Sequence, residues 1–167
     1  MKQKLALSCA LIHKPRLLVL DEPTTGVDTV SRTEFWETLR KLRQHDITIV
    51  ASTPYMDEAM KCDRVALIQD GQLMSIDRPQ NIRDGFSRKL FSARAADKYR
   101  LLLALRNFPG TLSVYPFGDS IHVTFSEEIP GTELSEHLLK SGITDAALCE
   151  TEAGIEDRFL ELMGKNE

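Results

Sequence analysis

Two short runs dominated by apolar residues, 17–20 and 47–51, constrain this chain more than any other feature. The first run stops at Asp21 and the second at Ser52. Runs of this kind are typical of parallel strands that helices cover on both faces. Between them, residues 30–44 repeat apolar side chains at helical spacing, which predicts a crossover helix. Together the three segments predict a βαβ unit.

The segments around this unit complete a first domain of about 84 residues. Apolar spacing predicts an opening helix that ends before Pro15, because the residue before a proline avoids the helical region. Residues 63–76 predict a hairpin around the Asp70-Gly71 turn, and Pro79 predicts the start of a short helix. Residues 1–84 are formally neutral, so the net charge of −4 belongs to residues 85–167. We therefore place a domain boundary there, giving domains 1–84 and 85–167.

The second domain has a different periodicity. The elements expected, in order, are a strand within 88–96, a helix from Tyr99, hairpin strands at 112–115 and 121–125, a helix at 134–139, a strand within 143–149 and an amphipathic helix at 155–163. The order βαββαβ followed by α predicts a small ferredoxin-like α+β domain. His122 alternates with apolar neighbours, so we expect it to be solvated or half-buried on the opposite face. A solvated acidic surface is expected from six carboxylates: Glu127, Glu128, Glu150, Glu152, Glu156 and Asp157.

Composition excludes several classes of function. The net charge of −4 gives no general electrostatic footprint for nucleic acid. The longest apolar runs are far shorter than the ~20 residues of a membrane-spanning helix, so we expect no crossing of the membrane by this chain itself. The cysteines, Cys9, Cys62 and Cys149, form no CxxC pair, and we expect unpaired core residues in a reducing compartment.

The strongest chemical signal is the adjacent carboxylate pair, Asp21 and Glu22. In open α/β sheets, ligands gather at the carboxyl ends of the strands, and this pair comes directly after one. One acid could hold a hydrated metal while the other lies beside a water. Alternatively, the two acids only cap the next segment and Pro23 enforces a turn. Spacing alone leaves both interpretations open.

A family resemblance rests on longer stretches of the first domain. Residues 17–28, LLVLDEPTTGVD, resemble the Walker B motif and D-loop of ABC-type ATPases. Residues 1–7 resemble the segment directly after the signature glycines of that family, and 52–65 resemble the switch-loop region. The residues of these stretches are most similar to those of ATP-binding subunits of ABC-2 type exporters. The resemblance implies an α/β fold: the distal part of a P-loop ABC-type ATPase domain with parallel strands, followed by the small C-terminal domain.

The resemblance also assigns roles to residues. It makes Asp21 the Mg²⁺ ligand, acting through water, and Glu22 the catalytic base or orienter of the attacking water. The D-loop would face a second ATPase subunit and comprises Thr24, Thr25, Gly26, Val27 and Asp28. An N-cap of the next helix is the plainer role for Asp28, and both roles are compatible.

Two departures from the family pattern bear on activity. The chain contains no GxxxxGK[ST] loop and no signature glycines, so we expect no productive ATP binding by this chain alone. Pro54 occupies the position of the switch histidine and offers neither an imidazole nor a backbone N–H. Either the ATP site is degenerate, or Thr53 simply caps a helix with Pro54 at its first position. In that second case Asp57 and Glu58 would complement the helix dipole.

Histidines elsewhere in the first domain do not make good substitutes for the missing one. His13 and His45 lie near predicted helix ends, where a solvated role is expected. Whether the protein is a working enzyme is therefore open at this stage.

Three functions are compatible with the resemblance. The first is an ATP-hydrolysing subunit of an ABC-type exporter that uses ATP and Mg²⁺. It would pair with a second ATPase subunit and with a transmembrane permease, on the cytoplasmic face of the plasma membrane. The second is a degenerate, non-hydrolysing regulatory partner in such a pair. The third is a soluble ABC ATPase not linked to transport, although the charge balance disfavours nucleic-acid contact.

Overall fold

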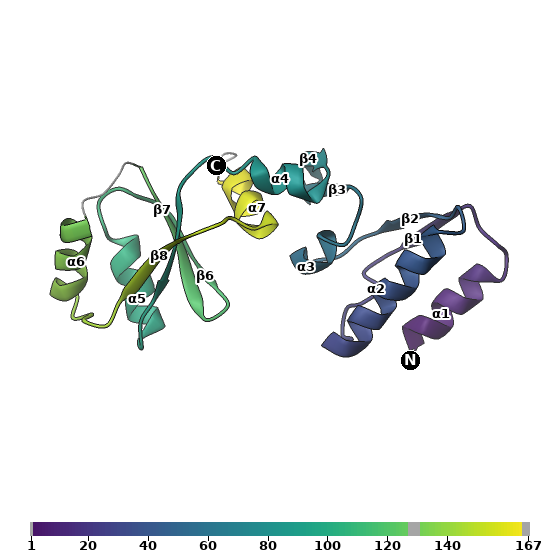
Figure 1. Ribbon diagram of the computed structural model, residues 1–167, viewed down its shortest axis with the longest axis horizontal. Coiled ribbons are helices and arrows are strands. Elements are labelled where there is room, and N and C mark those ends of the chain that lie inside the picture. Colours follow the sequence, from purple (N-terminus) through teal and green to yellow (C-terminus); the bar gives the residue numbers. More distant parts are fainter. Residues whose placement is uncertain (1, 127–130, 165–167) are drawn as a thin grey trace. The chain divides into compact units, whose positions relative to one another are not determined.

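The computed structural model describes residues 2–126 and 131–164. The predictions for Met1, Glu127, Glu128 and Pro130 lie outside this range. The chain divides into two compact units (Figure 1). Among the described residues, the first unit comprises 2–82 and 162–164, and the second comprises 83–126 and 131–161.

The first unit contains the predicted βαβ unit. Its elements are α1 (Lys2–Leu11), β1 (Leu17–Leu20), α2 (Thr29–Arg43), β2 (Thr48–Ala51), α3 (Met56–Ala59), β3 (Val65–Gln69), β4 (Gln72–Asp77) and α4 (Pro79–Asp84). Strands β1 and β2 pair in parallel, with Leu17 opposite Thr48 and Leu20 opposite Ala51. Figure 1 shows the crossover helix α2 running beside α1. The prediction of parallel strands joined by a helix is confirmed.

Only one face of the β1–β2 sheet is buried within the described residues. Leu18 packs with Leu7 of α1 and with Phe35, Trp36 and Leu39 of α2. On the other face, Leu17, Val19 and Val50 are exposed, and 68% of Val19 is accessible to solvent. The expectation of helices on both faces is therefore wrong for this chain, although the apolar pattern that suggested it is real. A parallel sheet with one bare apolar face lacks a layer that such sheets normally have.

The hairpin of β3 and β4 forms around the predicted turn. The two strands are antiparallel, and Asp70 and Gly71 between them have φ of 51° and 75°. Two successive positive φ angles characterise a type I′ turn, whose twist matches that of the strands. Glycine at position 71 adopts this conformation without steric cost.

The second unit is a four-stranded antiparallel sheet with helices. Its elements are β5 (Leu90–Arg94), α5 (Lys98–Arg106), β6 (Thr111–Phe117), β7 (Ser120–Phe125), α6 (Gly131–Lys140), β8 (Ala147–Thr151) and α7 (Ile155–Met163). The sheet order is β6-β7-β5-β8, so the two strands that begin and end the βαββαβ segment lie side by side. The mixed α/β class is thus observed, with the element order expected from the sequence.

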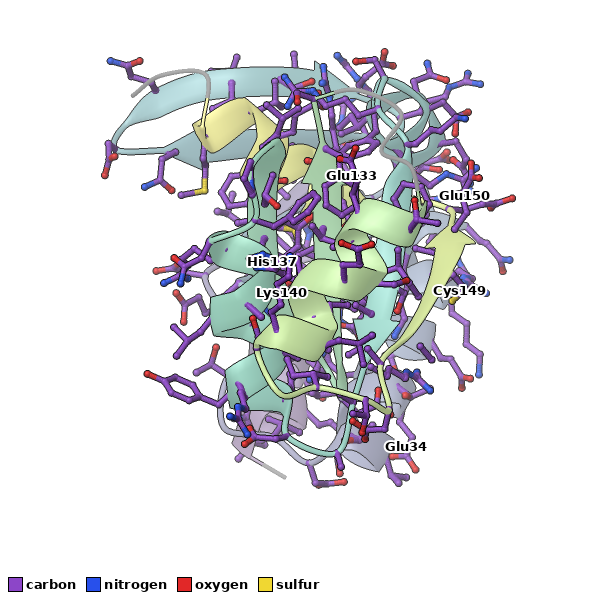
Figure 2. The ribbon with its side chains drawn as sticks, turned by 90° about the vertical axis from the view of Figure 1, so that its left-hand side faces the viewer. Glu34, Glu133, His137, Lys140, Cys149 and Glu150 are labelled. Atoms are coloured by element: carbon purple, nitrogen blue, oxygen red, sulfur yellow. The ribbon has the colours of Figure 1, made fainter. Side chains whose placement is uncertain are left out.

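One face of this sheet carries the main core of the unit. Ile121 and Val123 of β7 are fully buried against α5 and α6, which contribute Leu101, Leu105, Leu134 and Leu138. Helix α6 is tied to α5 where His137 Nε2 lies 2.9 Å from the Ala104 carbonyl (Figure 2). The strict alternation of β7 therefore places its apolar side chains as predicted.

The other face carries a buried polar cluster instead of a solvated one. His122 Nδ1 lies 2.6 Å from Asp157 Oδ1, to which the Tyr115 hydroxyl also donates at 2.6 Å. The Gly154 N–H donates to Asp157 Oδ2 at 2.6 Å, and the Phe117 ring stacks on His122 at a centroid distance of 4.0 Å. Burial raises the pKa of the Tyr115 hydroxyl, and its hydrogen bond to Asp157 raises it further.

Two predictions for this face are consequently wrong. His122 does point away from the main core, but it is only 6% exposed and not half-buried or solvated. Asp157 is 1% exposed, so it does not belong to an acidic surface. The reason is that Asp157 reaches from the first turn of α7 onto this face of the sheet. Glu150, Glu152 and Glu156 are exposed, as expected.

The cysteines also differ from expectation. Cys9 and Cys149 are exposed, so the prediction of core residues is wrong for these two. Cys62 is partly buried and packs against the core of the first unit. Cys149 lies on β8, a strand at the edge of the sheet with one unpaired side (Figure 2). All three thiols are free. No helix in the described part of the chain has the length and apolar character to span a membrane.

Candidate functional site

The site predicted from the sequence forms where β1 and β2 end. Asp21 and Glu22 come directly after β1 and Ser52 after β2, and parallel pairing brings these ends to the same edge. The Ser52 hydroxyl donates to Asp21 Oδ1 at 2.6 Å and accepts the Glu22 N–H at 2.8 Å. One hydroxyl thus holds both acidic residues in place. The sequence marked Ser52 as the end of a strand and the start of the stretch that resembles a switch loop, but gave no signal for these two hydrogen bonds.

Glu22 has an unusual backbone conformation. Its φ is +42°, in the left-handed region, which costs a residue other than glycine about 1–3 kcal/mol. The Glu22 side chain is exposed, and its Oε2 accepts the Thr25 hydroxyl at 3.0 Å. Such strain persists where surrounding contacts enforce it, and it concentrates at functional sites. This geometry argues against a plain turn with a capping acid, since the cap of the next helix is made by another residue.

That cap is Asp28. It precedes α2, and its Oδ1 accepts the Ser31 N–H at 3.0 Å. This backbone hydrogen bond is the main reason why the pKa of Asp28 lies below its usual value. The predicted N-cap role is therefore confirmed. Asp28 is exposed, as are Thr25 and Gly26.

Thr24 behaves differently from the rest of the predicted D-loop. It is 1% exposed, and its hydroxyl donates to Glu58 Oε2 at 2.9 Å. Its side chain therefore cannot face a second subunit, which corrects the expectation for this residue. Next to it, a hollow of about 210 Å³ lies between the loop, α1 and α2, with Val27 and Phe35 among its lining residues.

Glu58 is the centre of a buried polar cluster that sequence reasoning missed. Its side chain is 0% exposed. Oε1 accepts Arg32 Nε at 2.9 Å, while Oε2 accepts the Thr53 hydroxyl at 2.6 Å in addition to that of Thr24. Arg32 also donates to both carboxylate oxygens of the exposed Asp57, and its guanidinium lies 3.9 Å from the Tyr55 ring centroid.

This cluster corrects the predicted helix start. The short helix α3 begins at Met56 with Tyr55 as its N-cap, so neither Thr53 nor Pro54 occupies the expected position. The Thr53 hydroxyl accepts the Tyr55 N–H at 3.1 Å and donates to Glu58, which draws it inward. The Glu58 carboxylate is buried and hydrogen-bonded within this cluster, so it is not an exposed charge at the start of the helix.

We expect acid to destabilise the first unit through Glu58. Burial by itself raises the pKa of this carboxyl, but hydrogen bonds, led by those from Thr53 and Thr24, outweigh burial and hold it below the usual value. A lowered pKa in the folded state stabilises the fold above the unfolded pKa, and this contribution is lost as pH falls through the folded value. For one carboxyl, the free energy of unfolding falls by at most about 1.4 kcal/mol per pH unit.

Urea unfolding followed by fluorescence of Trp36, the single tryptophan, measures this effect. In Glu58→Gln, the dependence of the unfolding midpoint on pH in the acid range should become shallower. Asp57→Asn is the control, because Asp57 is exposed and contacts the same arginine. If the unfolding midpoint of Glu58→Gln depends on acid pH as steeply as that of the unsubstituted protein, Glu58 is not the source of the acid sensitivity.

Pro54 is exposed and lies between Thr53 and Tyr55, two residues after Ser52. His13 and His45 are exposed and precede β1 and β2, so they lie at the opposite edge of the sheet from Asp21. They cannot replace a histidine at position 54 within this unit. Among residues 2–126 and 131–164, no group of three or more metal-ligating side chains occurs. A lone carboxylate such as Asp21 suits Mg²⁺ that retains its waters and is also held by phosphate oxygens.

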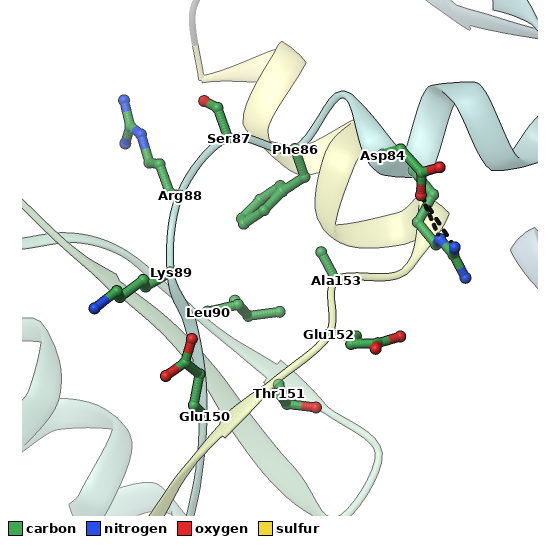
Figure 3. Close-up of a pocket in the computed structure, with 11 residues that line it drawn as sticks. Asp84, Phe86, Ser87, Arg88, Lys89, Leu90, Glu150, Thr151, Glu152 and Ala153 are labelled. Atoms are coloured by element: carbon green, nitrogen blue, oxygen red, sulfur yellow. Dashed lines mark hydrogen bonds and ion pairs between the residues drawn. The ribbon is translucent and has the colours of Figure 1, made fainter.

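A separate hollow of about 430 Å³ lies within the second unit (Figure 3). It is open and lined by residues of both charges, including Arg88, Lys89, Glu150 and Glu152. None of the residues predicted for the site lines it.

Comparison with known proteins finds ATP-binding proteins of ABC transporters and exporters. Nod factor export ATP-binding protein I of Bradyrhizobium diazoefficiens is 33% identical over 167 residues, covering 99% of this chain and 52% of the relative. Probable multidrug ABC transporter ATP-binding protein YbhF of Escherichia coli is 43% identical over 82 residues, covering 49% of this chain and 14% of the relative. Linearmycin resistance ATP-binding protein LnrL of Bacillus subtilis is 39% identical over 77 residues, covering 46% of this chain and 25% of the relative.

These matches are partial on the side of the relatives, since the chain spans between 14% and 52% of their lengths. No protein-family model matches the chain. Among solved structures, CbiO1 from Clostridium perfringens, part of the ABC transporter complex CbiONQ, aligns with a TM-score of 0.45 and 28% identity. That alignment covers 48% of this chain and 33% of the CbiO1 chain. A TM-score of this size does not establish a shared fold.

Proposed function

Because the chain is homologous to ABC transporter ATP-binding proteins, we propose that it contributes the Walker B acids and the D-loop to an ATP-hydrolysing subunit of an exporter. The observation that carries this proposal is a pair of adjacent acidic residues at the shared end of two parallel strands, where the Ser52 hydroxyl contacts the Asp21 carboxylate and the Glu22 backbone N–H. A strained Glu22 backbone at the same place supports it.

In the proposed reaction, bound MgATP supplies the phosphoryl group that is transferred to water. Asp21 would hold Mg²⁺ through a water, and its orientation is fixed by the Ser52 hydroxyl. Glu22 would accept a proton from the attacking water or orient it, since its carboxylate is exposed and already anchored by Thr25. The exposed positions Thr25, Gly26 and Asp28 would face the second ATPase subunit.

The phosphate loop of such a site has to come from residues outside this sequence, because the sequence contains no GxxxxGK[ST]. We propose that the segment carrying that loop packs on the bare apolar face formed by Leu17, Val19 and Val50. Covering this face would complete the two-sided burial that parallel strands normally have.

The proposed partners are a transmembrane permease and a second ATPase subunit, identical or different, at the cytoplasmic face of the plasma membrane. We also propose that the second unit is a ferredoxin-like domain. The order β6-β7-β5-β8 and the βαββαβ connection support this. Co-purification with an integral membrane protein tests the transport assignment. Recovery without any membrane partner would favour the soluble ABC ATPase unlinked to transport.

One observation favours the degenerate regulatory partner as a second candidate. Pro54 offers no group that can donate to a γ-phosphate, and the chain has no histidine at the same edge of the sheet among the described residues of the first unit. Glu22 remains in place, so impaired hydrolysis is expected before loss of binding.

We therefore expect Pro54→His to raise ATP turnover by about tenfold or more, because one correctly placed donor is worth that much or more in a transition state. The rate is measured in a protein in which this chain is continued upstream by a segment with a phosphate-binding loop. Pro54→Ala is the matched control, since it removes the ring without adding an imidazole. Equal rates for the two variants would remove the missing histidine as an explanation.

A further inference from the structure

We infer that Glu58 is a positioning residue that couples the loop of residues 22–28 to the segment of residues 52–55. This inference rests on the proposed function for its meaning, because it links the loop that would face the second subunit to the segment beside the reacting water. Its structural content is independent of that function. Among the described residues, Glu58 hydrogen-bonds to neither Asp21 nor Glu22.

The coupling depends on one shared oxygen. Thr24 and Thr53 both donate their hydroxyl protons to Glu58 Oε2, at 2.9 and 2.6 Å, from segments that are far apart in the sequence. A displacement of either hydroxyl therefore changes the acceptor that the other one uses. Glu58 and Thr24 are buried, so water cannot replace a lost partner of either side chain without cost.

Arg32 holds the other side of the carboxylate. It donates Nε to Oε1 from α2, the helix that Asp28 caps at the end of the same loop. Its guanidinium also lies over Tyr55, the residue after Pro54. Breaking a buried ion pair leaves an uncompensated charge, so Glu58 and Arg32 have to remain together as the loops move.

A second tie joins the same two segments at the exposed edge. There Ser52 contacts Asp21 and Glu22, whereas Glu58 contacts Thr24 and Thr53 from the interior. Two ties at different depths make the segments move as one body. A displacement of Thr25 or Gly26 by a contacting subunit would thus be transmitted to Ser52, which hydrogen-bonds to Asp21 and to the Glu22 backbone.

Amide hydrogen exchange in the 167-residue chain, without nucleotide, tests this coupling. The reporters are the N–H of Val27, bonded to the Thr24 carbonyl, and the N–H of Tyr55, bonded to the Thr53 hydroxyl. Glu58→Gln should accelerate exchange at both by about threefold to tenfold, the size expected for one lost hydrogen bond. Asp57→Asn is the matched control, with the same loss of charge one residue away and the same arginine as partner.

Milder variants provide the decisive reciprocal measurement. Thr53→Val should accelerate exchange at Val27, and Thr24→Val should accelerate it at Tyr55, although neither substitution touches the reporter in the other segment. The internal reference is the N–H of Thr48, bonded to Arg16 at the far edge of the sheet. A purely structural role would raise exchange at Thr48 as much as at the reporters.

The outcomes separate cleanly. Reciprocal acceleration with an unchanged Thr48 rate supports the coupling. The inference is overturned by effects confined to the substituted segment, by equal acceleration at Thr48, or by equal effects of Asp57→Asn and Glu58→Gln. Because no nucleotide is present, failure of the proposed ATPase function would show in hydrolysis assays and would leave these exchange rates unaffected.

Discussion

Glu22→Gln should lower steady-state MgATP hydrolysis by about 10²–10⁴-fold, the usual contribution of a positioned general base. The substitution keeps the size of the side chain and its ability to accept the Thr25 hydroxyl at a carbonyl oxygen. It removes only the negative charge and the basicity. The Glu22 N–H to Ser52 contact involves the backbone and should survive, so nucleotide binding is expected to change little.

The assay uses the chain continued upstream by a segment with a phosphate-binding loop, and nucleotide binding is measured separately. Glu37→Gln is the control, because Glu37 is exposed on α2 and lies outside the site. Normal hydrolysis by Glu22→Gln would remove this acid from the proposed mechanism. Binding without hydrolysis in the unsubstituted protein and in the variant would make the protein a degenerate partner, and the working site would be sought on the neighbouring subunit.

The elements of both units could be predicted because their apolar periodicity is local. The run at residues 17–20 and the alternation in 121–125 each identify a strand without knowledge of distant residues. The edge at which Asp21 meets Ser52 is also predictable, since parallel strands end together. The exposed face of β1 could not be foreseen, because an apolar pattern shows that a face needs cover and not which residues provide it.

The buried polar clusters around Glu58 and Asp157 could not be predicted from the sequence, for a physical reason. Glu58 and Asp157 both lie in acid-rich segments where a solvated role is the simplest expectation. Most of their hydrogen-bond partners are 26 to 42 residues away in the sequence. Only Asp157 has a short-range sequence pattern that indicates its role. Asp157 accepts the N–H of Gly154, three residues earlier, which is half of a capping box at the start of α7.

Asp157→Asn should destabilise the second unit by about 1–3 kcal/mol. The substitution preserves shape, so no cavity forms, and the effect isolates hydrogen bonding. Asp157 accepts from Tyr115 at Oδ1 and from Gly154 at Oδ2, with His122 Nδ1 also at Oδ1. If the asparagine oxygen faces Tyr115 and His122, its NH₂ group meets the Gly154 N–H, donor against donor. If the oxygen faces Gly154 instead, Tyr115 and His122 both have to accept a hydrogen bond from the NH₂ group. Each unsatisfied buried donor costs about 1–3 kcal/mol.

Calorimetric unfolding, together with amide exchange at Val123, measures this loss, because the single tryptophan lies in the first unit. Glu156→Gln is the matched control: it removes the same charge from the adjacent, exposed position of α7 and should change stability by less than about 0.5 kcal/mol. If Asp157→Asn unfolds the unit outright, Tyr115→Phe, which removes one donor and leaves the carboxylate, should still cost about 1 kcal/mol. A tolerated Asp157→Asn would mean that this carboxylate does not hold α7 against the sheet.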